Sequence, residues 1–142
     1  MNNRAMIASY GEQKEKRSGN IYRDQAGNIF SYGSHYPLLF KVNSKWYVNE
    51  QGYSNTTARH ISLARQFADI SVKIPNGSSF SSDLSYDLKN AYKLLTGYLK
   101  DEIAGIEAEE KTTIRKKTQK YARIIIKLDN AKENLQKHLL NK

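Results

Sequence analysis

Two polar segments in the first half of the chain hold the residue types that could do chemistry. Residues 31–38 and 52–60 contain two of the three histidines and many hydroxyl groups. His35 and His60 are of the right type to act as acid and base in a metal-independent nuclease. No Asp or Glu flanks either histidine to orient it, so the simpler interpretation is structural. In that interpretation the hydroxyls cap turns and a helix start, and the histidines pack and form hydrogen bonds.

Other catalytic signatures are missing from the sequence. The chain has no cysteine, which excludes a disulfide scaffold, a Cys-ligated metal and thiol catalysis. It has no His-Glu-x-x-His motif, no phosphate-binding Gly loop and no paired carboxylates, and its histidines are poorly spaced for a metal. We therefore expect no catalytic residues, no cofactor and no metal site.

The same two segments resemble a small uncharacterised domain of phage and mobile-element proteins. The likeness covers about residues 27–67 and rests on an aromatic-Ser-Tyr-Gly-x-His-x-Pro-Leu strand and a Gly-Tyr-Ser-x-Thr-Thr-x-x-His strand-to-helix turn. Its signature positions in this chain are Tyr32, His35, Pro37, Tyr53, Ser54, Thr56, Thr57 and His60. The resemblance implies a phage accessory protein and assigns no catalytic residue. Small cysteine-free phage proteins of this kind resemble inhibitors of bacterial defence, including anti-CRISPR proteins.

Short aromatic and β-branched runs between Gly and Asn residues predict a small antiparallel sheet in residues 1–60. Nine of the fifteen aromatic residues lie in this stretch. We expect a tight turn at Asn43-Ser44 and a polar loop over residues 14–18. The expected strands lie near residues 4–10, 20–24, 28–33, 37–42 and 45–49. Exposed aromatics on such a sheet could stack on bases, although aromatics at strand spacing are more often core.

One short helix and a linker follow the predicted strands. Asn55, Thr56 and Thr57 offer capping oxygens for a helix over residues 57–69, and residues 72–75 are expected to be extended. The Ser-rich residues 76–82 have the composition of a linker. The sequence thus predicts an α+β module over residues 1–75 and a separate helical element over 83–142.

Hydrophobic residues in that helical element recur in two seams. One seam runs from Leu84 to Ile106 in steps of three or four, and the other runs from Ile114 to Leu139 in strict alternation of four and three. Between Ile114 and Leu139, the members of the second seam are Thr118, Tyr121, Ile125, Leu128, Lys132 and Leu135. Residues 107–113, between the seams, have no large apolar side chain. This pattern predicts either a helical hairpin that turns at 107–113 or one long coiled-coil helix.

The compactness expected of a short chain favours the hairpin. A continuous helix of about 58 residues would be roughly 87 Å long, whereas a compact domain of 142 residues has a radius of gyration of about 14 Å. The long helix would need a second chain over its seam, such as a homodimer partner. No apolar run is long enough to cross a membrane, and the N-terminal residues lack the pattern of a signal peptide. We therefore expect a cytoplasmic protein without membrane contact.

The net charge of +9 is concentrated near the C-terminus. Residues 76–110 carry three basic and seven acidic side chains, whereas residues 111–142 carry ten basic and two acidic ones. On a helix, Lys116, Lys120, Arg123 and Lys127 align on one face. The candidate contact residues are Arg115, Lys116, Lys117, Lys120, Arg123 and Lys127. The face could bind phosphates or an acidic protein surface, or it could be a solvated face partly neutralised by the preceding glutamates.

We interpret the chain as a non-enzymatic binding protein. The resemblance implies a phage-encoded inhibitor of a bacterial nucleic-acid-handling defence machine, such as a CRISPR effector ribonucleoprotein, in the cytoplasm of the host. The basic helix face would make the stoichiometric contact. Three alternatives remain: a protein that binds DNA or RNA directly, a small nuclease, and a phage assembly component built on the coiled coil.

Overall fold

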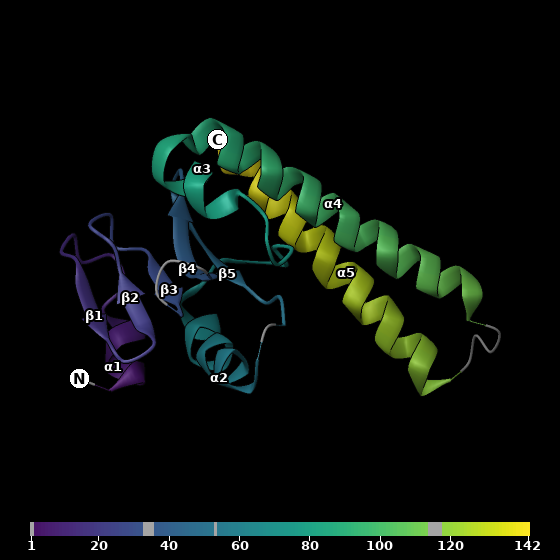
Figure 1. The fold of residues 1–142 in the computed structure, drawn as a ribbon. Coiled ribbons are helices and arrows are strands. Elements are labelled where there is room, and N and C mark those ends of the chain that lie inside the picture. Colours follow the sequence, from purple (N-terminus) through teal and green to yellow (C-terminus); the bar gives the residue numbers. More distant parts are fainter. Residues whose placement is uncertain (1, 33–35, 53, 114–117) are drawn as a thin grey trace.

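A six-stranded sheet forms the centre of an α+β fold, with helices on both of its faces (Figure 1). The computed structural model describes residues 2–32, 36–52, 54–113 and 118–142. The strands are β1 (Lys16–Ser18), β2 (Ile21–Arg23), β3 (Ile29–Ser31), β4 (Tyr36–Val42), β5 (Lys45–Asn49) and β6 (Ile70–Val72). The helices are α1 (Asn3–Ala8), α2 (Asn55–Ala64), the 3-10 turn η1 (Arg65–Phe67), α3 (Phe80–Tyr86), α4 (Leu88–Thr112) and α5 (Gln119–Leu140).

The strands lie in sequence order, and every neighbouring pair except the last is antiparallel. The chain from β5 to β6 passes through α2 and η1, which makes this pair parallel and leaves β6 at the edge of the sheet. The register between β3 and β4 shifts, because Ile29 pairs with Leu39 while Phe30 pairs with Pro37. This extra residue in β4 is a bulge that changes which face the following side chains occupy.

Two separate hydrophobic clusters cover the two faces of the sheet. Met6 and Ile7 of α1 and Ile61 of α2 pack on one face. On the other face, Phe80 of α3 and Leu95 of α4 belong to the same cluster as sheet residues of β3 to β6. Because both faces are covered, six of the seven residues of β4 are buried.

The chain from α4 to α5 forms an antiparallel helical hairpin, which confirms that geometry over a continuous helix (Figure 1). The half of the hairpin nearer its turn extends beyond the sheet (Figure 1). Its small cluster of Ile106, Ile124, Leu128 and Ala131, with Ile103 packed against it, contains hairpin residues alone. We call this half, residues 103–112 and 119–131, the arm.

Two details of the predicted hairpin are wrong. Residues 107–112 belong to α4 rather than to the turn, since Glu, Ala and Lys are good helix formers and no Gly or Pro interrupts them. The buried stripe of α5 also runs one position away from the predicted seam. Ile124, Ala131 and His138 are buried on it, and Lys132 and Leu139 are exposed.

Several predictions in the first half also need correction. Residues 3–8 form a helix instead of a strand near 4–10, and the expected loop over 14–18 contains β1. Residues 80–82 of the predicted linker open α3, whose Phe80 is 1% exposed in the core. The boundary at 76–82 therefore does not separate two cores, because α3 and α4 share one cluster with the sheet.

None of the helices in the described part of the chain is both long and apolar enough to span a membrane.

Candidate functional site

The hydroxyl-rich segments of the sequence meet at the start of α2. Ser54 is the N-cap of this helix, and its hydroxyl accepts a hydrogen bond from the backbone N–H of Thr57. The phenol oxygen of Tyr32, a residue with a φ of 58°, lies 2.9 Å from the same Ser54 Oγ. Hydrogen bonds with Ser54 and Thr56 lower the pKa of Tyr32. These signature residues therefore form the cap of a helix, as the structural interpretation expects.

His60 lies in the second turn of α2 and is 1% exposed. Its Nε2 is 3.3 Å from the amide nitrogen of Asn3, which can only donate, so Nδ1 carries the proton and donates to Ser31 Oγ at 2.8 Å. Burial lowers the pKa of His60 and favours this neutral form. With both ring nitrogens engaged inside the protein, the geometry gives no support to His60 as the acid or base of a nuclease.

Replacing Ser31 with alanine should lower the free energy of unfolding by about 1–2 kcal/mol, because it leaves the buried Nδ1–H of His60 without its acceptor. Urea unfolding monitored by circular dichroism measures this change. Ser62→Ala is the control, since Ser62 is an exposed serine on α2, the helix that carries His60. This substitution should change the free energy of unfolding by less than about 0.5 kcal/mol. Equal effects of the two substitutions would contradict a structural role for the Ser31–His60 hydrogen bond.

The remaining signature residues His35 and Tyr53 lie outside the described residues. The sheet aromatics Tyr36 and Trp46 could stack on bases only if their rings were exposed. Tyr36 is buried, and its hydroxyl donates to the carbonyl oxygen of Asn49 at 2.8 Å. Trp46 is half-buried and packs edge-on against Tyr10 at a centroid distance of 4.7 Å. These two rings belong to the protein's own packing and are not arranged as a stacking platform.

The predicted basic face lies on the first half of α5, within the arm. Arg115, Lys116 and Lys117 lie outside the described residues. Lys120 and Arg123 are exposed, and no ion pair between described residues involves either of them. Lys127 is also exposed, but its Nζ is 3.5 Å from Glu109 Oε2 of α4. The acidic segment before the turn therefore neutralises Lys127, and the unpaired described cations of this face are Lys120 and Arg123.

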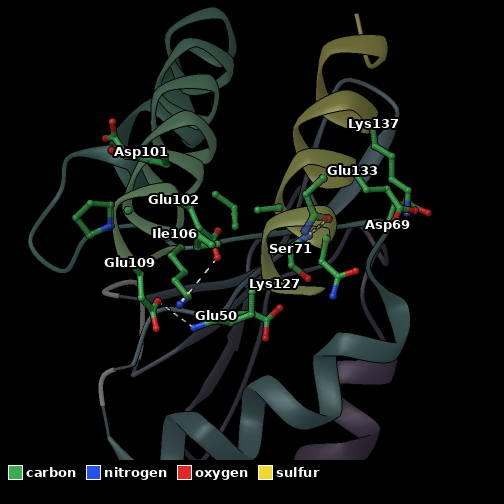
Figure 2. Close-up of a pocket in the computed structure, with 18 residues that line it drawn as sticks. Glu50, Asp69, Ser71, Asp101, Glu102, Ile106, Glu109, Lys127, Glu133 and Lys137 are labelled. Carbon is green, nitrogen blue, oxygen red and sulfur yellow. Dashed lines mark hydrogen bonds and ion pairs between the residues drawn. The ribbon is translucent and has the colours of Figure 1, made fainter. Parts of the chain in front are cut away.

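A groove of about 780 Å³ separates the hairpin from the outer edge of β6 (Figure 2). Six carboxylates line it, from Glu50, Asp69, Asp101, Glu102, Glu109 and Glu133. Three lysines also line it, Lys73, Lys127 and Lys137. Figure 2 shows Glu102 on α4, and Glu133 on α5 beside Lys137 and Asp69. The groove is therefore acidic although the whole chain is strongly basic.

Four of the six carboxylates of the groove form ion pairs within the protein. Glu50 pairs with Arg65, and Glu109 pairs with Lys127. Lys73 Nζ is 4.0 Å from Glu102 Oε1, at the limit for an ion pair, and Lys137 pairs with Glu133 one turn away on the same helix at 3.3 Å. Burial raises the pKa of Glu102, and the nearby Lys73 counteracts this in part. A second cation near Glu102 would stabilise its charged form.

A buried polar network joins the end of α5 to the sheet and to α4. His138 is fully buried, with Nδ1 2.8 Å from the phenol oxygen of Tyr47 and Nε2 2.7 Å from Thr96 Oγ1. The His138 ring also stacks on Tyr92 at a centroid distance of 4.1 Å. Asn141, which is 2% exposed, donates from Nδ2 to the carbonyl of Val42 and to the Tyr47 oxygen. We call Tyr47, Tyr92, Thr96, His138 and Asn141 the C-terminal polar network.

The hydrogen bonds of this network assign each proton. The Thr96 hydroxyl donates to the backbone oxygen of Tyr92, so it must accept from Nε2–H of His138. Nδ1 of His138 is then the acceptor for the Tyr47 hydroxyl, whose oxygen in turn accepts from Asn141. Burial lowers the pKa of His138 to about 4. The imidazole is thus held neutral in one tautomer.

Sequence reasoning did not single out His138 or Asn141. The signal that could have found His138 is the alternative heptad seam Ile124, Leu128, Ala131, Leu135 and His138, which shares two positions with the predicted one. A polar residue on such a seam is buried, so it must find hydrogen-bond partners.

No family model matches the chain, and no curated protein or solved structure is detectably similar to it. Among the described residues, no three histidine or acidic side chains are grouped in a way that could hold a metal ion. The class of protein is therefore described by its architecture alone, as an α+β domain with a projecting two-helix arm.

Proposed function

We propose that this protein is a non-enzymatic binding protein that acts by stoichiometric contact through the basic side of its arm. The partner is a bacterial nucleic-acid-handling protein or ribonucleoprotein, such as a CRISPR effector, and the protein acts as a phage-encoded inhibitor in the host cytoplasm. The observation that carries the proposal is the exposure of Lys120 and Arg123 without ion-pair partners among the described residues, on a part of the hairpin whose hydrophobic cluster consists of hairpin residues alone.

The position of these cations supports a role in binding more than a role in stability. The hydrophobic cluster of the arm consists of hairpin residues alone, and this half of the hairpin extends beyond the sheet (Figure 1). Like charges close together on a helix repel each other by a few tenths of a kcal/mol per pair. An acidic surface on a partner would turn this cost into an attraction and would also increase the association rate.

An exposed aliphatic side chain beside the cations favours a protein partner over bare nucleic acid. Ile126 is 59% exposed and lies three residues after Arg123, on the same side of α5. Arginine and apolar side chains are typical of protein–protein interfaces, whereas phosphate contacts are made by basic and polar groups. The arm thus offers both charge and a small apolar contact.

Charge reversal on the arm tests the proposal. In affinity capture from a nuclease-treated bacterial lysate, the wild-type protein should retain a specific partner, and Lys120→Glu combined with Arg123→Glu should lose it. The control is Lys100→Glu combined with Lys132→Glu, which makes the same charge change on exposed hairpin residues. Lys132 lies about 120° around α5 from Lys120, so the control should keep the partner.

Circular dichroism would show whether each variant remains folded. Capture by a folded arm variant at the wild-type level would remove the basic face as the contact surface. Loss of the partner on nuclease treatment would instead favour direct nucleic-acid binding. Gel shifts with DNA and RNA would then show an affinity that falls steeply between 50 and 200 mM salt, by roughly hundredfold for about four phosphates.

A further inference from the structure

The acidic groove is the described surface whose chemistry differs most from the rest of the chain. It is lined by six carboxylates and three lysines, in a protein whose net charge is +9. Its volume of about 780 Å³ is within the usual range for ligand sites, about 300–1,000 Å³. A surplus of carboxylates between two helices and a sheet edge concentrates negative potential inside the groove.

The floor of the groove includes the outer strand of the sheet. This strand is β6, and its Ser71 and Val72 line the groove together with Lys73. The backbone N–H of Ser71 already donates to Asn134 Oδ1 of α5 at 3.1 Å, so α5 covers this part of the edge. The backbone N–H of Lys73 has no hydrogen-bond partner among the described residues. An exposed strand edge binds extended peptides through main-chain hydrogen bonds.

The length of the groove suits a short extended segment. Its α4 wall runs from Tyr98 to Glu109, about 16 Å at 1.5 Å per residue. About five residues of extended chain, at 3.3 Å each, cover this distance. Basic side chains of such a segment could reach Glu102 of α4 and Glu133 of α5, both of which line the groove.

We propose that the groove between the hairpin and β6 binds an extended, lysine- or arginine-rich segment of a partner protein. The acidic walls would supply the charge complementarity, and the free backbone N–H of Lys73, just after β6, would supply a main-chain contact. This site is separate from the basic face of the arm, although Lys127 borders both. The groove is therefore able to bind a partner even if Lys120 and Arg123 prove to have no role.

The test uses an eight-residue fluorescein-labelled peptide that alternates lysine and threonine, with a glutamate–threonine peptide as the negative control. Fluorescence anisotropy should show binding of the lysine peptide with a Kd below about 100 μM and no binding of the acidic one. Glu102→Gln combined with Glu133→Gln should weaken the affinity by about tenfold. The control pair Glu107→Gln and Asp129→Asn removes the same charge from the exposed surface of the same two helices, outside the groove, and should change the affinity by less than about twofold.

Three results would overturn the proposal. These are failure of the lysine peptide to bind at 1 mM, an equal loss of affinity in both double variants, and unchanged affinity in the groove variant. Sedimentation of the unliganded protein tests the other possible occupant of the groove, a second copy of this chain. Self-association that the groove substitutions abolish would show that such a copy fills the groove. The arm variant with Lys120→Glu and Arg123→Glu should bind the lysine peptide at least as well as wild type, which separates this site from the proposed function.

Discussion

Replacing His138 with alanine should lower the free energy of unfolding by about 4 kcal/mol. Removing a buried ring leaves a cavity, and large-to-alanine substitutions of this kind typically cost about 3–5 kcal/mol. The substitution also leaves the Tyr47 and Thr96 hydroxyls without their partners in a buried place, at about 1–3 kcal/mol for each unsatisfied group. Since a domain of this size is stable by only about 5–15 kcal/mol, the variant should be close to unfolding.

Urea unfolding followed by circular dichroism measures this effect. Gln136→Ala is the matched control, because Gln136 is exposed on the same helix and its replacement should change the free energy by less than about 0.5 kcal/mol. If His138→Ala were as mild as the control, the C-terminal polar network would not be what fastens α5 to the sheet.

The stability of the wild-type protein should fall by about 3 kcal/mol between pH 6.5 and pH 4 through His138 alone. The pKa of this group is about 4 in the folded protein and 6.5 in the unfolded chain, so in this window the unfolded chain binds the proton and the folded protein does not. The stabilising contribution is therefore complete above pH 6.5 and is lost as the pH falls towards 4. Each pKa unit corresponds to about 1.4 kcal/mol.

Free energies of unfolding at several pH values between 4 and 8 test this dependence. His138→Gln keeps a polar side chain of similar length but cannot titrate, so most of the slope should disappear in this variant. A smaller slope should remain, because burial also lowers the pKa of His60. A slope in the variant equal to that of wild type would show that other groups control the acid sensitivity.

The middle of the sheet could be predicted because its local signals agree with its packing. Short aromatic and β-branched runs between Gly and Asn residues, together with the Asn43-Ser44 turn, located β4 and β5 closely. Asn43 has the positive φ of 57° that a tight turn needs. The capping hydroxyls after Gly52 located the start of α2 within two residues. In these segments, local preference and tertiary contacts favour the same structure.

Other elements could not be predicted because distant contacts determine them. Residues 3–8 read as a strand, yet they form α1 because Met6 and Ile7 cover the same sheet face as α2. β1 has no apolar pattern and exists by pairing with β2. Phe80 sits in a Ser-rich stretch that resembles a linker, but its ring fills the core beside Phe40 at a centroid distance of 5.0 Å. Tertiary packing overrides composition at all three places.

The candidate sites also differ in whether the sequence alone could predict them. The hydroxyl cluster could be found from the sequence, because Ser and Thr residues just before a helix commonly cap its first turn. The exposed cations Lys120 and Arg123 were also visible as a charge run. The acidic groove could not be found, because its carboxylates come from α4, from α5, from the residue after β5 and from the residue before β6, and only the fold brings them together. The pairing of Lys127 with Glu109 likewise required the turn to be placed after Thr112 rather than at 107–113.

A calorimetric titration with the purified captured partner tests whether the arm binds a protein through Lys120 and Arg123. We expect saturation at a fixed molar ratio, with an affinity about hundredfold lower for Lys120→Glu combined with Arg123→Glu and unchanged for Lys100→Glu combined with Lys132→Glu. Equal affinities for the wild-type protein and the folded arm variant would contradict it.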